Sequence, residues 1–185
     1  SQPGTVVTEV TLNHEFLMSS LYTDSEQALA RTAIGMHSGD DLNILVGGLG
    51  LGYTAREALQ SDRVAHVEVV EFLPQVLDWL ARGLVPLATE LRNERRLVVT
   101  QGDVYRRLAS PPDELVDVIL IDVDHSPEEH LGEESGAFYT TTGLVAARRH
   151  LTTDGVLAVW SYAESSPFAD SLREVFAHVH VQPVT

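Results

Sequence analysis

Short apolar runs alternate with helical patterns along most of this sequence, and this alternation limits the fold more than any other feature. Buried strands are predicted at residues 42–46, 64–70, 96–100, 116–121 and 156–160. Apolar residues recur at helical spacing between them, at residues 54–59, 74–84, 104–108 and 142–150. This order specifies an α/β fold with a mostly parallel sheet and helices on both faces.

The first forty residues carry weaker signals. Residues 5–12 alternate β-branched and polar side chains, and the turn candidate Asn13-His14 precedes a second apolar run. A short N-terminal β-hairpin is therefore expected. The N-cap pattern Thr23-Asp24-Ser25-Glu26 predicts a helix that continues to Gly35 or Gly39.

A helix over residues 167–176 and a strand over residues 179–184 complete the predicted elements. No repeat and no Pro- or Ser-rich linker divides the 185 residues. We expect one domain over residues 1–185, with a hairpin at 1–20 and an α/β core at 21–185.

Composition excludes several classes of function. With 44% hydrophobic and 21% charged residues the chain is globular, and the absence of cysteine removes disulfides, thiolate metal sites and cysteine nucleophiles. No apolar run approaches the ~20 residues of a membrane helix, and no secretion signal is visible, so a soluble cytoplasmic protein is expected. The net charge of −15 disfavours nucleic acid and suits a neutral or cationic small molecule, although it can also serve solubility alone.

A glycine-rich loop lies directly after the first core strand and directly before a helix. It reads Gly48-Leu49-Gly50-Leu51-Gly52. Glycines at such a place permit a tight turn and let a ligand approach the backbone at the helix N-terminus. The acidic residue Glu71 ends the next strand, where its carboxylate can accept both ribose hydroxyls. Together these features indicate nucleoside binding.

Two further strand ends carry carboxylates. Asp103 follows the third strand, where it can either contact an adenine amine or cap the next helix. The fourth strand runs into Asp122, Asp124 and His125. Ligand groups gather at the carboxyl ends of parallel strands, so these three residues are candidates for substrate contact and proton transfer.

Successive motifs of this sequence resemble those of the spermidine synthase family, a branch of the Rossmann-like class I methyltransferase superfamily. The resemblance runs roughly from Asn13 to Ser161. It rests on five stretches: residues 46–59, Val70-Glu71, Gly102-Asp103, residues 117–127, and Phe138-Tyr139 through residues 153–157.

The resemblance implies an S-adenosyl ligand, either S-adenosylmethionine or its decarboxylated form, and no metal. Gly48, Gly50 and Gly52 would wrap its sulfonium part, Glu71 would hold the ribose and Asp103 the adenine. In the usual sheet of this superfamily a further antiparallel strand would follow residues 179–184. No such strand is present in this sequence. Either the sequence is truncated or the edge of the sheet is completed differently.

The sequence departs from the family pattern in the chemical motifs. The family's glycine motif falls on residues 48–53, which puts Leu51 where an aspartate would meet the amine end of the cofactor. Either Asp124 or His125 could replace the amine-activating aspartate. The motif before the first helix falls on Asn13-His14-Glu15, and it makes His14 and Glu15, with Tyr53 beside the glycine loop, candidate substrate contacts.

These departures favour methyl transfer from S-adenosylmethionine to a small molecule, with Asp122 or Asp124 positioning the nucleophile and His125 accepting its proton. The alternative is aminopropyl transfer from decarboxylated S-adenosylmethionine to a diamine, in which Asp124 or Glu15 takes the ammonium proton. A second alternative is a non-catalytic adenosyl-binding module. A homodimer is a further expectation.

Other polar residues carry less weight. His178 and His180 share a face of the predicted last strand, yet no third metal ligand is evident, so they are read as edge-strand histidines. Ser161 lacks the Gly-x-Ser-x-Gly elbow of a hydrolase.

Overall fold

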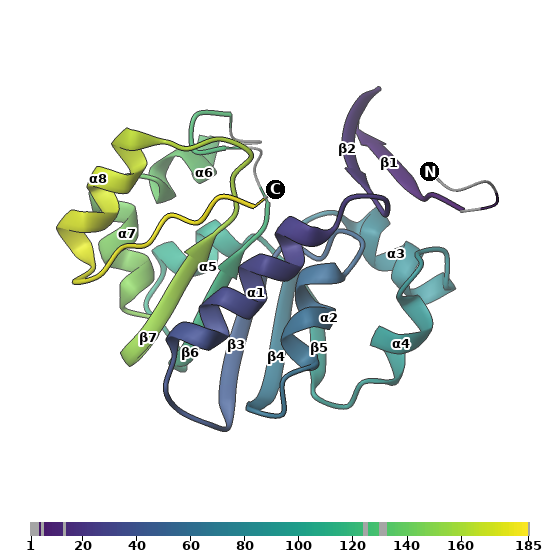
Figure 1. Cartoon of the computed structure of the whole chain (residues 1–185), viewed down its shortest axis with the longest axis horizontal. Helices are drawn as coiled ribbons and strands as arrows, with labels where there is room; N and C mark the ends of the chain where they lie inside the picture. Colours follow the sequence, from purple (N-terminus) through teal and green to yellow (C-terminus); the bar gives the residue numbers. More distant parts are fainter. Residues whose placement is uncertain (1–3, 5, 13, 124–125, 130–132, 185) are drawn as a thin grey trace.

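The structure, a computed structural model, describes residues 4, 6–12, 14–123, 126–129 and 133–184. Its centre is a five-stranded sheet in the order β5-β4-β3-β6-β7 (Figure 1). Every neighbouring pair in that sheet is parallel. The strands are β3 (Leu42–Gly47), β4 (Val64–Glu71), β5 (Leu97–Gln101), β6 (Val116–Ile121) and β7 (Leu151–Val159). The predicted α/β fold with a mostly parallel sheet is confirmed.

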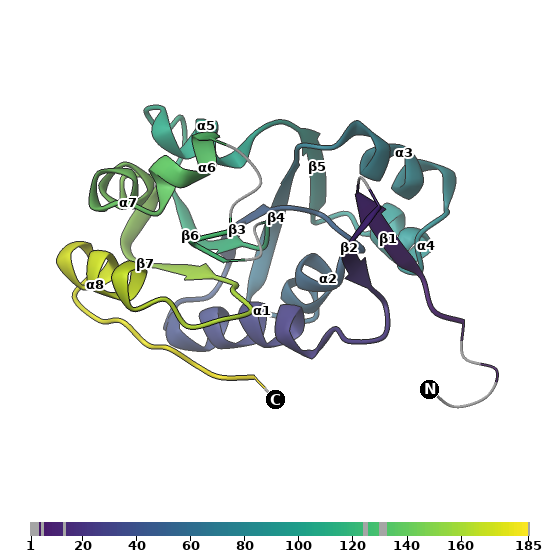
Figure 2. The ribbon, with the colours of Figure 1, turned by 90° about the horizontal axis from the view of Figure 1, so that it is seen from above.

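Each central strand sends alternate side chains into two separate apolar layers. Ile44 and Val46 of β3 pack into one buried cluster and Leu45 into the other, because successive side chains of a strand point to opposite faces. The first layer is formed by α1 (Asp24–Met36), α2 (Tyr53–Leu59), α3 (Pro74–Arg82) and α4 (Ala88–Asn93). The second is formed by α5 (Val104–Ala109), α6 (Glu133–Phe138), α7 (Thr141–Arg148) and α8 (Ser166–Val175). Figure 2 shows α1 and α2 on one side of the sheet and α5, α6 and α7 on the other.

The helix bounds follow the predictions with small differences. The helix predicted over residues 74–84 ends at Arg82, because Gly83 adopts a left-handed conformation and the amides of Gly83 and Leu84 close the last turn on Leu80 and Trp79. The six-residue helices α4 and α6 were not predicted. Helices of this length give only a weak periodic signal, and α5, of the same length, was predicted because it follows Gly102-Asp103.

The N-terminal hairpin is confirmed, in a shorter form. β1 (Glu9–Leu12) pairs antiparallel with β2 (Glu15–Ser19), and the pairing shifts register between Val10 and Thr11. Val10 is buried in the layer of α1 to α4. The hairpin therefore attaches to the core above the carboxyl ends of the strands (Figure 1).

The prediction of a strand over residues 179–184 is wrong. Residues 176–184 contain no strand, and the segment runs outside the sheet, where the hydroxyl of Thr32 in α1 donates to Gln182. A period of two is satisfied by any extended segment, so it does not establish that a neighbouring strand is within reach. His178 and His180 accordingly do not lie on an edge strand.

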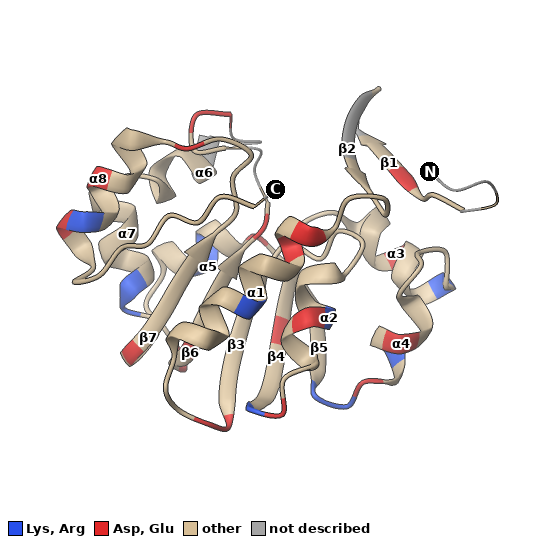
Figure 3. Cartoon of the chain, in the orientation of Figure 1, with Lys and Arg blue, Asp and Glu red and all other residues tan. Residues whose placement is uncertain are grey.

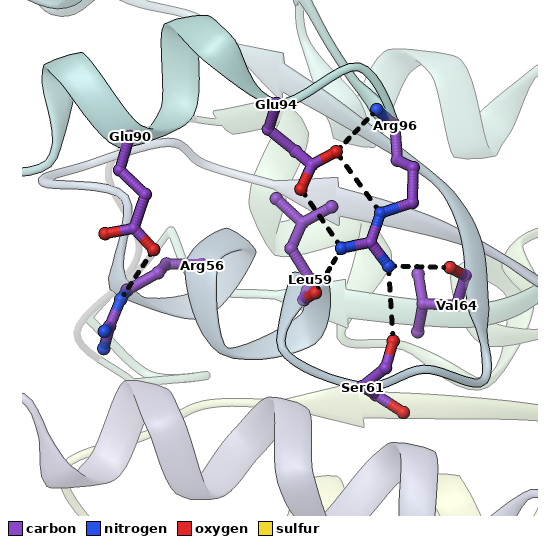
Figure 4. A network of polar contacts seen from close by, with 7 residues as sticks. All are labelled: Arg56, Leu59, Ser61, Val64, Glu90, Glu94 and Arg96. Carbon is purple, nitrogen blue, oxygen red and sulfur yellow. Dashed lines mark hydrogen bonds and ion pairs between the residues drawn. The ribbon is translucent and has the colours of Figure 1, made fainter.

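Arginine side chains hold the amino-terminal edge of the sheet together. Arg96 donates to the carbonyl oxygens of Leu59, Ser61 and Val64 and pairs with Glu94 (Figure 4). It thus ties the end of α2 to the starts of β4 and β5. Arg63 does the same for the end of α1, through the carbonyls of Ile34, His37 and Gly39.

The strand order reverses between β3 and β6, which are neighbours although far apart in sequence. Open parallel sheets bind ligands beside the carboxyl ends of the strands at such a reversal, so a site is expected here. Within the described residues, no helix is long and apolar enough to cross a membrane.

Candidate functional site at the carboxyl edge of the sheet

The glycine loop after β3 is shaped by close contacts within the protein. Gly48 and Gly52 have φ values of 90° and 92°, which other residues rarely adopt. A Cβ atom on Gly48 would lie 2.3 Å from the carbonyl oxygen of Asp122, and one on Gly52 would lie 2.4 Å from a methyl group of Leu91. Gly48 is therefore required by its contact with backbone, whereas at Gly52 the positive φ is what favours glycine, because the leucine methyl group can move.

Gly50 lies under the hairpin. Its φ is 52°, and a Cβ there would be 3.3 Å from the sulfur of Met18 in β2. The hairpin thus approaches the glycine loop.

Both leucines of the loop point into the core. Leu49 and Leu51 are each 5% exposed and belong to the layer of α1 to α4. Leu51, which stands where the family motif has an aspartate, is thus a buried apolar residue in this chain.

Glu71 organises the loop from the end of β4. One carboxylate oxygen accepts the amide of Leu49 at 2.8 Å, and the other accepts the amide of Leu73 at 2.7 Å. The side chain is buried, at 6% exposure. Each carboxylate oxygen has two acceptor sites, so a hydroxyl pair could still bind there.

Asp103 caps α5. Its Oδ1 accepts the amides of Tyr105 and Arg106, which is the capping role weighed above. Both capping bonds go to Oδ1, so Oδ2 takes no part in the cap. An adenine contact through Oδ2 stays a prediction. Phe72, next to Glu71, is 66% exposed at the same edge and offers an aromatic surface.

Asp122 follows β6 at the point where the strand order reverses. Its Oδ2 accepts a 2.6 Å hydrogen bond from the hydroxyl of Thr54, in the first turn of α2. Burial raises the pKa of the Asp122 carboxyl to about 6, the hydrogen bond from Thr54 acts in the opposite direction, and the charge of Glu26 adds to the increase. Asp122 can therefore exchange a proton near neutral pH.

A second carboxylate reaches this edge from α1. Glu26 lies in the first turn of α1 and accepts a hydrogen bond from Ser25. Its charge acts on Tyr53 as well as on Asp122: burial raises the pKa of the Tyr53 hydroxyl, Arg56 lowers it and Glu26 raises it. Figure 3 shows acidic residues at the start of α1 and just past β6. The edge is thus negative and suits a cation.

Several predicted residues are not brought into this arrangement. Asp124 and His125 lie outside the described residues, and so does the side chain of Glu15. His14 is exposed in the hairpin turn with a φ of 69°. No group of three His, Asp or Glu residues in the described ranges could hold a metal ion.

Sequence reasoning missed Glu26, Thr54 and Phe72. The acidic first turn of α1 was recognised as a helix start, and its place beside β6 depends on how α1 packs across the sheet. Thr54 could have been suspected from its position just after the glycine loop, and Phe72 from its position after Glu71.

Comparison with known proteins finds polyamine aminopropyltransferases among the relatives of this chain. The chain is 36% identical over 137 residues to polyamine aminopropyltransferase 2 of Streptomyces coelicolor, a match that covers 72% of this chain and 23% of that protein. It is 28% identical over 139 residues to a polyamine aminopropyltransferase of Prochlorococcus marinus, covering 75% of this chain and 44% of the relative. The chain therefore spans less than half the length of these relatives. No family profile matches it.

A solved structure extends the likeness to the fold. A spermidine synthase in complex with the transition state analogue AdoDATO superposes with a TM-score of 0.71 at 21% sequence identity, over 88% of this chain and 56% of that one. The short hairpin followed by a Rossmann-like core agrees with that comparison.

Proposed function

Because the chain is spermidine synthase-like in sequence and has the Rossmann-like class I methyltransferase fold, we propose that it is an S-adenosyl-type transferase. The reaction proposed is aminopropyl transfer from decarboxylated S-adenosylmethionine to a small amine. The curated relatives carry this activity in their names, and they favour the aminopropyl alternative over the methyl transfer expected from the sequence.

The observation that carries the proposal is the negative edge formed by Asp122 and Glu26. A diamine is a cation and gains from these charges, whereas the carboxylate tail of S-adenosylmethionine would be repelled by them. The decarboxylated cofactor lacks that tail.

The nucleoside half of the ligand would lie along the glycine loop. Gly48, Gly50 and Gly52 shape the loop, Glu71 would accept the ribose hydroxyls, and Asp103 would accept the adenine amine through Oδ2. Phe72 would stack on the base. The fit is supported by the burial of Glu71 and the exposure of Phe72.

The transfer itself is a substitution at carbon. The neutral amine nitrogen attacks the propyl carbon bonded to sulfur, a C–N bond forms, the C–S bond breaks, and methylthioadenosine leaves as a neutral thioether. The acceptor becomes neutral before the attack by giving the proton of its ammonium form to a carboxylate, for which Asp122 is the candidate, with Asp124 and His125 close to it in sequence. The sulfonium is already a good leaving group, so most of the acceleration would come from orientation and electrostatics.

The test is an activity assay in which the purified chain is incubated with each cofactor and a set of acceptor amines. Decarboxylated S-adenosylmethionine with putrescine should yield methylthioadenosine and an aminopropylated amine, both measured by mass spectrometry. S-adenosylmethionine with the same amine should yield no methylated product.

Methylation without aminopropyl transfer would overturn the proposal in favour of methyl transfer. Calorimetric binding of methylthioadenosine without turnover of any amine would favour a non-catalytic adenosyl-binding module. Absence of binding would contradict the placement of the nucleoside.

A further inference from the structure

A hydrogen bond joins the two halves of the candidate site. Thr54 lies in the first turn of α2, directly after the glycine loop, and Asp122 lies just past β6. The hydroxyl of Thr54 donates to Oδ2 of Asp122 over 2.6 Å, and Thr54 is 2% exposed. The contact therefore connects the loop proposed to hold the nucleoside with the carboxylate proposed to face the amine.

The backbone of Asp122 is already fixed without this bond. Its amide donates to the carbonyl of Gly47 at 2.9 Å, and its own carbonyl oxygen packs against Gly48. What remains free is rotation of the side chain, and the Thr54 hydrogen bond removes that freedom. In the described part of the chain, this bond engages Oδ2, and no hydrogen bond to Oδ1 is found.

Thr54 is suited to this task by its shape. A β-branched residue in a helix is restricted in χ1, so its hydroxyl has few directions to choose from. Threonine in a helix commonly donates back to a carbonyl of the preceding turn. Here the hydroxyl is instead used across elements, from α2 to the end of β6.

We propose that Thr54 is a positioning residue, whose hydroxyl holds one oxygen of Asp122 so that the other faces the acceptor amine. This inference rests on the proposed role of Asp122. It adds a link between occupancy of the glycine loop and the direction of the carboxylate, because a shift of the first turn of α2 moves Thr54 with it.

The charges around Asp122 set the direction of the expected pH effect. Glu26 faces it from α1 and opposes its ionisation, while Thr54 favours the ionised form. Glu71 ends the neighbouring strand β4 with both its oxygens bonded to amides. Asp124 and His125 follow Asp122 in sequence, outside the described residues. Loss of the Thr54 hydroxyl should therefore raise the pKa of Asp122.

The decisive variants are Thr54→Val, which keeps the shape and removes the hydroxyl, and Thr54→Ser, which restores it. Thr152→Val is a matched control, because the hydroxyl of Thr152 donates to Asp117 at the opposite end of β6 over 3.0 Å. We expect Thr54→Val to move the acidic limb of kcat/KM upward by about one pH unit and to lower kcat about tenfold at neutral pH, with methylthioadenosine affinity unchanged. Thr54→Ser should restore most of the activity, and Thr152→Val should leave the acidic limb in place.

The carboxyl pKa of Asp122 is also measured directly by carbon-detected NMR titration of the parent and Thr54→Val chains. An upward shift in Thr54→Val alone supports the inference even if no amine is turned over, in which case only the proposed reaction fails. An unchanged Asp122 titration, or an equal shift in Thr152→Val, would overturn it.

Discussion

At the residue scale, the carboxyl edge combines groups that stabilise the fold with groups that weaken it. Glu71 satisfies two loop amides, and Gly48 permits β3 and β6 to approach. Asp122 does the reverse, because its carboxyl is held where ionisation is unfavourable. Such a residue is typical of a functional site, where burial brings a pKa close to the working pH.

Asp122→Asn should therefore stabilise the protein at neutral pH. The pKa of Asp122 is raised in the folded chain to about 6, so the stability that the protonated carboxyl provides is fully present below about pH 4 and is lost as the pH rises through 6. We expect the free energy of unfolding of Asp122→Asn to exceed that of the parent by about 1–3 kcal/mol at pH 7.5. Urea titrations at several pH values measure it, and the difference should vanish near pH 4; a variant less stable at every pH would contradict the assignment.

Glu26 should act on the amine and leave the nucleoside unaffected. Glu26→Gln removes one charge from the edge, so the KM for putrescine should rise about tenfold while the affinity for methylthioadenosine stays the same. Asp24→Asn is the control, because Asp24 lies in the same first turn of α1 and is exposed. Steady-state kinetics compare the two variants, and an equal effect of both would assign the change to general surface charge.

At the element scale, the sequence predicted the core well because burial on both faces leaves a continuous apolar signature in each strand. Residues 116–121 were predicted with the bounds observed for β6. The errors fall where period alone is ambiguous: the extended tail after α8 has no strand beside it, and α4 and α6 are single turns or little more. The strand ends of the site followed from the fold, whereas the contact of Thr54 with Asp122 depends on how α2 packs.

The starts of β4 and β5 should depend on Arg96. Arg96→Lys keeps the charge and loses the planar fork that serves several carbonyls and Glu94 together, so we expect a loss of about 2 kcal/mol in the free energy of unfolding. Arg82→Lys changes an exposed pair with Asp78 and should cost less than about 0.5 kcal/mol. Thermal and urea unfolding compare them, and equal losses would refute the role of Arg96.

At the scale of the whole molecule, acidic residues outnumber basic ones, 27 to 12, and all twelve basic residues are arginine. The excess charge creates a field that extends beyond single contacts and is screened by salt. Arg63 and Arg96 explain part of the arginine usage, since each serves several backbone carbonyls at once.

Salt should therefore separate charged from neutral ligands. Raising ionic strength from about 0.05 M to about 0.5 M should weaken binding of cationic decarboxylated S-adenosylmethionine several-fold, while binding of neutral methylthioadenosine stays constant. Calorimetric titrations at both ionic strengths measure this, and parallel weakening of both ligands would show that the net charge does not steer binding.

The two edges of the sheet should differ in the substitutions that they tolerate. Arg63 and Arg96 anchor helix ends and loops at the amino-terminal edge, far from the side chains that would choose an acceptor. Exchanges at Glu26 or at other acceptor-facing positions then leave those anchors intact. Laboratory evolution toward bulkier or differently charged amines could accordingly proceed by single steps along the opposite rim, without a compensating mutation elsewhere.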